Sequence, residues 1–169
     1  DPFETAMRAI IGQQVSVSGA ATVGGRIVAA LGDDLRIADD ALSKVFPDPA
    51  AVADAEADLF AMPRRRSGTM RRVAGAVAAG ELVLDEASDP GVVRSDLFAV
   101  TGIGPWTADY VVMRGLGHPD VLLRTDLGVV RSAERLGVDL ADAARWSPWS
   151  SYAVHHLWAA ESLQRKEAS

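Results

Sequence analysis

A glycine pair followed by a proline is the first feature of this sequence that could do chemistry. Gly102 and Gly104 bracket a single apolar residue, Ile103, so the chain can turn there through backbone angles that other residues avoid. Pro105 suits the first turn of a helix, because its missing N–H would have no partner there anyway. The free N–H groups at such a helix start favour an anion, and a nucleic-acid phosphate is the obvious candidate. The stretch therefore predicts a tight turn between two helices that binds phosphate.

Asp126 is the second candidate, because it stands at the start of a predicted helix. It follows the apolar run 121–123 and immediately precedes the helical pattern 127–136. By position alone it is an N-cap, whose side chain accepts free N–H groups of the first turn. Other enzyme signatures are missing, since the sequence contains no dinucleotide loop, Walker loop, His-Glu-x-x-His or Gly-x-Ser-x-Gly.

The composition excludes several classes of protein. The 169 residues are enough for one well-buried core or two small lobes. The chain has no cysteine, which excludes disulfides, zinc–thiolate sites, thiol nucleophiles and iron–sulfur clusters. No uncharged apolar stretch is long enough to span a bilayer and no signal peptide is visible, so a cytoplasmic location is the default expectation. Because the first residue is Asp1, we expect a piece of a longer protein.

The charge distribution leaves one question open. A net charge of −6 argues against simple coating of nucleic acid, which relies on positive charge. Five arginines nevertheless fall within the nine residues 64–72. This cluster could face DNA while the opposite surface is acidic, or it could form the solvated start of a helix.

Helical periodicity dominates the chain and predicts an all-α fold. Two short apolar runs, 81–84 and 121–123, could be strands, but they are too short and isolated to build a sheet. The predicted helices cover residues 1–11, 16–31 (capped by Ser16 or Ser18), 48–61, 68–79, 91–100, 105–114, 127–136, 140–146 and 148–165.

Several motifs together resemble those of the helix-hairpin-helix DNA glycosylases, most closely the bacterial 3-methyladenine DNA glycosylase II branch. The Gly-Ile-Gly turn alone would also fit a plain connection between helices. Combined with an aspartate 22 residues after Gly104 and a Trp-x-Pro-Trp-x-Ser-Tyr-Ala segment, it is specific. The resemblance covers nearly the whole chain and includes the stretches 9–16, 102–110, 120–122, 146–153 and 156–158. It implies one glycosylase domain over residues 1–169, a two-lobed helical bundle without the family's N-terminal α+β domain.

The resemblance also implies the chemistry. The family's catalytic aspartate corresponds to Asp126, whose carboxylate would stabilise the positive charge that develops on the sugar as the N-glycosidic bond breaks. It could also orient or deprotonate the attacking water, and the sequence does not separate these roles. Members with lyase activity carry a lysine where this chain has Trp106. We therefore expect a monofunctional, water-using glycosylase.

The remaining site residues are carried over in the same way. The base pocket of the family corresponds to Trp106, Tyr110 and Trp158, whose aromatic faces suit a flipped, cationic base. The residue that fills the gap in the duplex corresponds to Gln14. The DNA-binding residues expected with it are Gly102, Ile103, Gly104 and Thr107. A structural Na⁺ or K⁺ would be held by the backbone carbonyls of Phe98, Val100 and Ile103, and no other cofactor is expected.

The sequence as a whole predicts an enzyme that excises alkylated purines, of the 3-methyladenine and 7-methylguanine type, from double-stranded DNA in base excision repair. We expect it near the nucleoid, away from membranes, as a monomer or as part of a longer chain. Thr125 and Leu127 replace an aspartate and a tyrosine that are common in close relatives, so the substrate range is open. The alternatives are a helix-hairpin-helix DNA-binding module without catalysis and a glycosylase for a mismatched or oxidised base.

Overall fold

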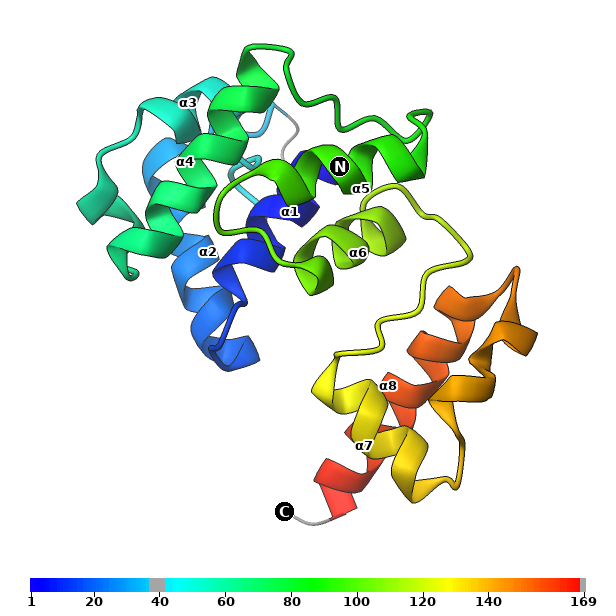
Figure 1. The fold of residues 1–169 in the computed structure, drawn as a ribbon. Coiled ribbons are helices and arrows are strands. Elements are labelled where there is room, and N and C mark those ends of the chain that lie inside the picture. Colours follow the sequence, from blue (N-terminus) through cyan, green and yellow to red (C-terminus); the bar gives the residue numbers. More distant parts are fainter. Residues whose placement is uncertain (37–41, 168–169) are drawn as a thin grey trace.

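The structure is a computed structural model that describes residues 1–36 and 42–167. Its helices form two groups, called here the larger and the smaller lobe, which are joined by the segment 115–126 (Figure 1). The predicted all-α, two-lobed fold is confirmed. The larger lobe contains α1 (Pro2–Ile11), α2 (Val17–Leu31), α3 (Pro49–Asp54), η1 (Ala57–Phe60), α4 (Arg64–Ala78), α5 (Pro90–Ala99) and α6 (Pro105–Arg114). The smaller lobe contains α7 (Leu127–Arg135), η2 (Leu140–Trp146) and α8 (Ser150–Glu167).

Each lobe has its own hydrophobic core. The larger core is built around α1, whose Met7 and Ile10 are fully buried against the neighbouring helices α4 and α6. The smaller core lies between α7 and α8 and includes the buried Val129 and Val154. Tyr110 on α6 packs against both cores, and Met113 on the same helix is buried in the smaller core, so the lobes meet along α6.

Most helices of the larger lobe, and α7, begin at a side chain that accepts N–H groups of the first turn. Asp1 accepts from Glu4, Ser16 from Gly19, and Asp126 from the N–H of Val129. Such a cap stabilises a helix by about 1 kcal/mol, which explains why the predicted helix starts agree well with the structure. The helices α4 and α6 are different, because α4 begins after Pro63 and α6 begins at Gly104, each without a side-chain cap.

The connection between the lobes is held by Asp120. Its carboxylate accepts hydrogen bonds from the hydroxyls of Ser147 and Ser150 and from the backbone N–H of Ser150, at the start of α8. These hydrogen bonds, above all those of the two hydroxyls, hold the pKa of the Asp120 carboxyl below its ordinary value. The segment 115–126 is thereby fixed to the helix that closes the smaller lobe.

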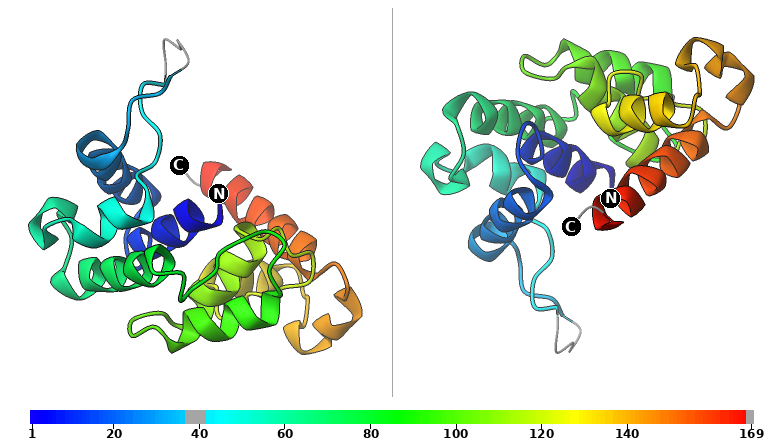
Figure 2. Two further views of the ribbon diagram at one scale, coloured as in Figure 1. Left: turned by 90° about the horizontal axis from the view of Figure 1, so that it is seen from above. Right: turned by 90° about the horizontal axis from the view of Figure 1, so that it is seen from below.

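The structure differs from the sequence predictions in two places. The helix expected over 48–61 is two shorter elements, α3 and η1, because Ala55 and Glu56 have extended backbone angles. The helix α4 begins at Arg64 rather than at 68, since the residues after Pro63 are good helix formers. Within the described residues no strand forms, and the one isolated bridge joins Asp34 and Lys44, on two segments that run side by side away from α2 (Figure 2). No described helix is both long and apolar enough to cross a membrane.

Candidate active site

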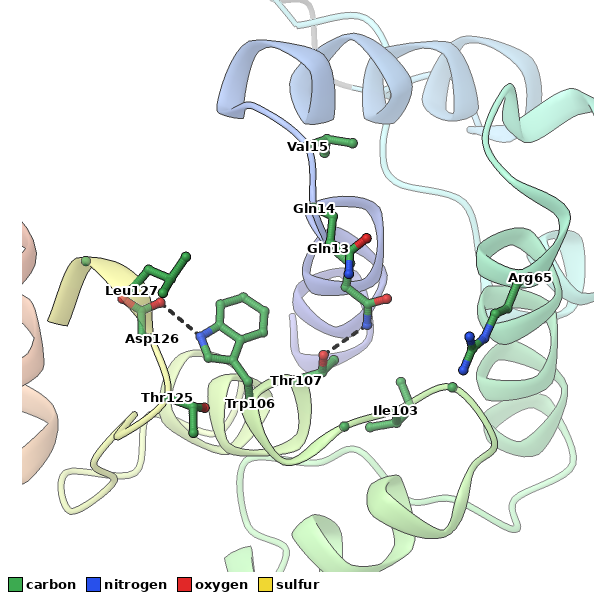
Figure 3. A pocket seen from close by; sticks show the side chains of 14 residues that line it. Gln13, Gln14, Val15, Arg65, Ile103, Trp106, Thr107, Thr125, Asp126 and Leu127 are labelled. Atoms are coloured by element: carbon green, nitrogen blue, oxygen red, sulfur yellow. Dashed lines mark hydrogen bonds between the residues drawn. The ribbon is translucent and has the colours of Figure 1, made fainter. Parts of the chain in front are cut away.

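A cavity of about 850 Å³ lies where the two lobes face each other. Its walls come from the loop 12–15 after α1, the hairpin 102–104 with the first turn of α6, the segment 125–128 at the start of α7, and Arg65 on α4 (Figure 3). The fold thus brings Gln14, the Gly-Ile-Gly hairpin and Asp126 to one place, although they are far apart in the sequence.

Asp126 lies at the smaller-lobe side of this cavity, and its carboxylate is held by three N–H donors. Oδ1 accepts from the backbone N–H of Val129 and from Nε1 of Trp158, each at 2.9 Å. Oδ2 accepts from Nε1 of Trp106, also at 2.9 Å (Figure 3). Asp126 is therefore both a helix cap and an oriented carboxylate at the cavity wall, so the two roles weighed from the sequence are compatible.

The three aromatic residues predicted for the base pocket form one group, but they do not all face the cavity. Trp106 lines it, while Tyr110 and Trp158 are absent from its walls. Tyr110 stacks on Trp106, with ring centroids 5.1 Å apart and an angle of 24° between the planes, and it lies 6.2 Å from Trp158. The three rings contact one another, and stacking of a flipped base on Tyr110 and Trp158 stays a prediction.

The ring of His155 packs edge-on against the indole of Trp158, and the two ring centroids are 5.4 Å apart. Partial burial, the positive charge of Arg114 and the neighbouring His156 lower the pKa of His155 below its ordinary value. A neutral imidazole therefore supports this indole near neutral pH.

The hairpin depends on one of its two glycines more than on the other. Gly102 has a φ of 101°, and a Cβ added there would lie 2.0 Å from Oγ1 of Thr69 on α4. Gly104 has an ordinary φ of −95° with nothing within 4 Å of an added Cβ, so the expectation of unusual backbone angles is wrong for this glycine. The open space beside Gly104 leaves the start of α6 accessible to a phosphate.

Ile103 and Thr107 support the hairpin from inside. Ile103 is 6% exposed and packs into the larger core, and Thr107 is 3% exposed. Thr107 Oγ1 accepts a hydrogen bond from Nε2 of Gln13, 3.0 Å away (Figure 3). Their side chains are thus engaged within the protein, and the backbone N–H of Ile103 donates to the carbonyl of Val100.

Gln13 is a residue that the sequence reasoning missed. It fastens the loop after α1 to the first turn of α6, while its neighbour Gln14 is exposed with a φ of 57°. A residue other than glycine keeps such a left-handed conformation only where its surroundings hold it. The one available signal was the position of Gln13 beside the residue chosen to fill the duplex gap.

The basic cluster 64–72 divides into two roles. Arg65 lines the cavity, and Arg65 and Arg66 both line a smaller hollow beside Gln14. Arg71 instead donates to the carbonyl of Ala53, and Arg72 donates to the carbonyl of Thr101 at the hairpin. Arg65 therefore faces the cavity and Arg66 the smaller hollow, whereas Arg71 and Arg72 hold neighbouring backbone in place.

The monovalent cation implied at the hairpin stays a prediction. The carbonyl of Phe98 lies in the last turn of α5, and those of Val100 and Ile103 lie in the turn between α5 and α6. Uncharged oxygens of this kind suit an alkali ion. The carbonyl of Val100 accepts the N–H of Ile103 at 3.0 Å, and a second lone pair is left for an ion. In the part of the chain that the structure describes, no group of three His, Asp or Glu side chains could hold a metal.

Comparison with known proteins gives close relatives for nearly the whole chain. It is 40% identical over 164 residues to the "Probable bifunctional transcriptional activator/DNA repair enzyme AlkA" of Mycobacterium tuberculosis, covering 94% of this chain and 33% of that protein. It is 34% identical over 173 residues to "DNA-3-methyladenine glycosylase 2" of Escherichia coli, covering 99% of this chain and 61% of the relative. These relatives confirm the resemblance to the helix-hairpin-helix DNA glycosylases that the sequence motifs predict.

The fold agrees with this family. The structure of MBOgg1 in complex with a low-affinity DNA ligand superimposes with a TM-score of 0.83, at 21% identity, and covers all of this chain and 61% of the other. No protein-family model matches the chain. The chain spans only a third to about three-fifths of the length of these two relatives.

Proposed function

We propose that this chain is the catalytic part of a monofunctional DNA glycosylase, which flips a damaged base out of double-stranded DNA and hydrolyses its N-glycosidic bond in base excision repair. The observation that carries the proposal is a single oriented carboxylate, Asp126, in the same cavity as the uncapped start of α6. A helix start with free N–H groups binds a phosphate, and a carboxylate stabilises a cationic sugar. The names of the two relatives and the DNA ligand of MBOgg1 agree with it.

The reaction follows from this arrangement. As the bond between the base nitrogen and C1′ breaks, its electron pair leaves with the base and positive charge develops on the sugar. The negative charge of Asp126 lowers the energy of that state. A water oxygen then adds to C1′ and releases a proton, for which the same carboxylate is the acceptor within the cavity wall. Trp106, in the first turn of α6, offers no amine that could attack the sugar instead.

Alkylated purines are the substrates that this site suits. A purine with a methyl group on N3 or N7 is cationic and leaves as a neutral molecule, so the enzyme need not protonate it. The exposed part of the Trp106 ring in the cavity adds an attraction of roughly 0.5–2 kcal/mol for a cationic base. A site with one carboxylate is sufficient for this reaction.

Release of free base from defined duplexes tests the proposal. The chain is mixed in excess with duplexes that contain 7-methylguanine, 3-methyladenine, hypoxanthine or 8-oxoguanine, and single-turnover rates are measured. We expect the cationic methylpurines to be released fastest. Fastest release of a neutral oxidised base would overturn the alkylpurine assignment and keep the glycosylase. DNA binding without release of any base would leave the non-catalytic module as the function.

A further inference from the structure

We propose that the indole N–H groups of Trp106 and Trp158 position the Asp126 carboxylate for catalysis, and that the missing side chain of Gly128 admits the second indole. The inference rests on the proposed function and assigns new roles at the same site. Both tryptophans were expected from the sequence as stacking surfaces for a base. The structure instead directs their polar atoms at the carboxylate.

The hydrogen bonds leave the carboxylate little freedom. Its two oxygens offer about four acceptor positions, of which Oδ1 uses two and Oδ2 uses one. Rotation of the carboxylate group would break all three bonds, whereas an ordinary N-cap is fixed by its backbone N–H alone. The remaining position is on Oδ2, the oxygen that Trp106 holds at the cavity wall. One carboxylate oxygen is thereby presented to the sugar in one orientation.

The donors come from opposite lobes. Trp106 stands in the first turn of α6, in the larger lobe, and Trp158 stands on α8, in the smaller lobe. Tyr110 packs between the two indoles, and His155 supports Trp158 from behind. Because each ring is held by aromatic neighbours, its N–H has a fixed direction. The geometry of Asp126 therefore depends on the correct seating of both lobes.

Gly128 makes room for the indole of Trp158. A Cβ added to Gly128 would lie 3.3 Å from Cδ1 of Trp158 and 3.2 Å from Oδ1 of Asp126. These distances are shorter than ordinary van der Waals contacts, so a methyl group would press the indole away from the carboxylate it binds. The glycine is the second residue of α7, in the first turn after the Asp126 cap. Its value here is the close approach of Trp158.

Substitution of tryptophan by phenylalanine separates hydrogen bonding from stacking. Phenylalanine keeps an aromatic ring and lacks the N–H, so Trp158→Phe and Trp106→Phe each remove one donor. Misplacement of a reacting group by a fraction of an ångström lowers rates strongly. We expect each variant to excise 7-methylguanine about tenfold or more slowly with unchanged affinity for DNA, and Gly128→Ala to lower the rate in the same direction. Trp149→Phe is the matched control, because Trp149 is 58% exposed, precedes α8 and does not line the cavity.

A spectroscopic readout makes the test independent of activity. The chain has four tryptophans, so its ¹⁵N spectrum contains four indole N–H signals that single Trp→Phe variants assign. We expect the signals of Trp106 and Trp158 to be protected from solvent exchange and to move in Asp126→Ala, while that of Trp149 stays in place. Asp126→Asn, which keeps a capping side chain, serves for the same comparison if the alanine variant does not fold.

The outcomes are distinguishable. If the wild-type chain releases no base from any duplex, the proposed function fails, and the response of the two indole signals alone decides whether the carboxylate is held as proposed. If neither signal responds to the change at Asp126, the clamp is overturned. If both respond but the Trp→Phe variants excise at the wild-type rate, the positioning role is overturned.

Discussion

The helices α6 and α7 both begin at the cavity, and they begin in opposite ways. The helix α6 starts at Gly104, where no side chain caps the free N–H groups, and α7 starts at Asp126, whose carboxylate accepts the N–H of Val129. The first end is electropositive and open to an anion, whereas the second carries a negative charge that faces the same cavity. Nucleic acid brings both partners, since its phosphates are anions and the sugar becomes cationic as a base departs.

The difference teaches how one element serves two purposes. A helix start has the same backbone in both places, and a single side chain decides whether it receives negative charge or presents it. Gly104 leaves the N-cap position of α6 without a side chain, so the N–H groups stay free for an anion. Asp126 places a carboxylate at the N-cap position of α7. The comparison is tested by removing the charge at the start of α7 and by adding a cap at the start of α6.

The largest effect is expected when the charge at the start of α7 is removed. Asparagine still caps the helix, but its NH₂ group cannot accept the indole N–H that Oδ2 of Asp126 accepts from Trp106, so Asp126→Asn should lower the free energy of unfolding by about 1–3 kcal/mol. It provides no negative charge to the sugar, and the single-turnover excision rate should fall by a factor on the order of 10²–10³ or more. A wild-type rate in this variant would remove Asp126 from catalysis.

A smaller effect is expected when the start of α6 receives a cap. Gly104→Asp has space for its side chain and an allowed φ, so the fold should be kept. The new carboxylate occupies the free N–H groups and repels phosphate, and we expect affinity for undamaged duplex DNA to fall about tenfold, measured by fluorescence anisotropy. Ala144→Asp on η2 is the control, because it adds the same charge at an exposed residue. Equal loss in both variants would mean that net charge, and not the hairpin, governs binding.

A third helix start sharpens the comparison through pH. The carboxylate of Asp120, in the segment between the lobes, receives the hydroxyls and N–H at the start of α8, and its pKa is lowered. A lowered pKa in the folded state means that the stabilisation is complete above the unfolded-state value near 3.8 and is lost as pH falls through the folded-state pKa. Asp120→Asn should therefore lower the Tm at pH 6, and the difference from the wild type should shrink below pH 4. A difference that is the same at both pH values would contradict this account.

The smallest expected effect is the absence of a covalent intermediate. Because the first turn of α6 presents an indole to the cavity and not an amine, no imine should form with the abasic sugar. Borohydride added during the reaction should trap no protein–DNA adduct on a denaturing gel, and strand cleavage should require added alkali or an endonuclease. A trapped adduct would assign a nucleophile to some other amine of the chain.

Much of this arrangement could be predicted from the sequence, because it depends on local signals. Helix starts follow capping residues such as Ser16 and Asp126, and the hairpin follows its glycines. The contacts between distant segments could not be predicted, since they depend on how the lobes pack. The bond from Gln13 to Thr107 and the two indole bonds to Asp126 are of this kind. Aromatic residues suggested a base pocket, but their spacing does not show which faces are covered.

The position of Tyr110 affects how the protein unfolds. Its ring packs against the cores of both lobes, so loosening either core removes contacts from the other. We expect the smaller lobe, which alone has few buried residues, to resist separate opening for this reason. Amide hydrogens of α7 and α8 should then exchange with solvent through the same cooperative unfolding event as those of α1. Tyr110 would in that way give the chain's two cores a single melting transition.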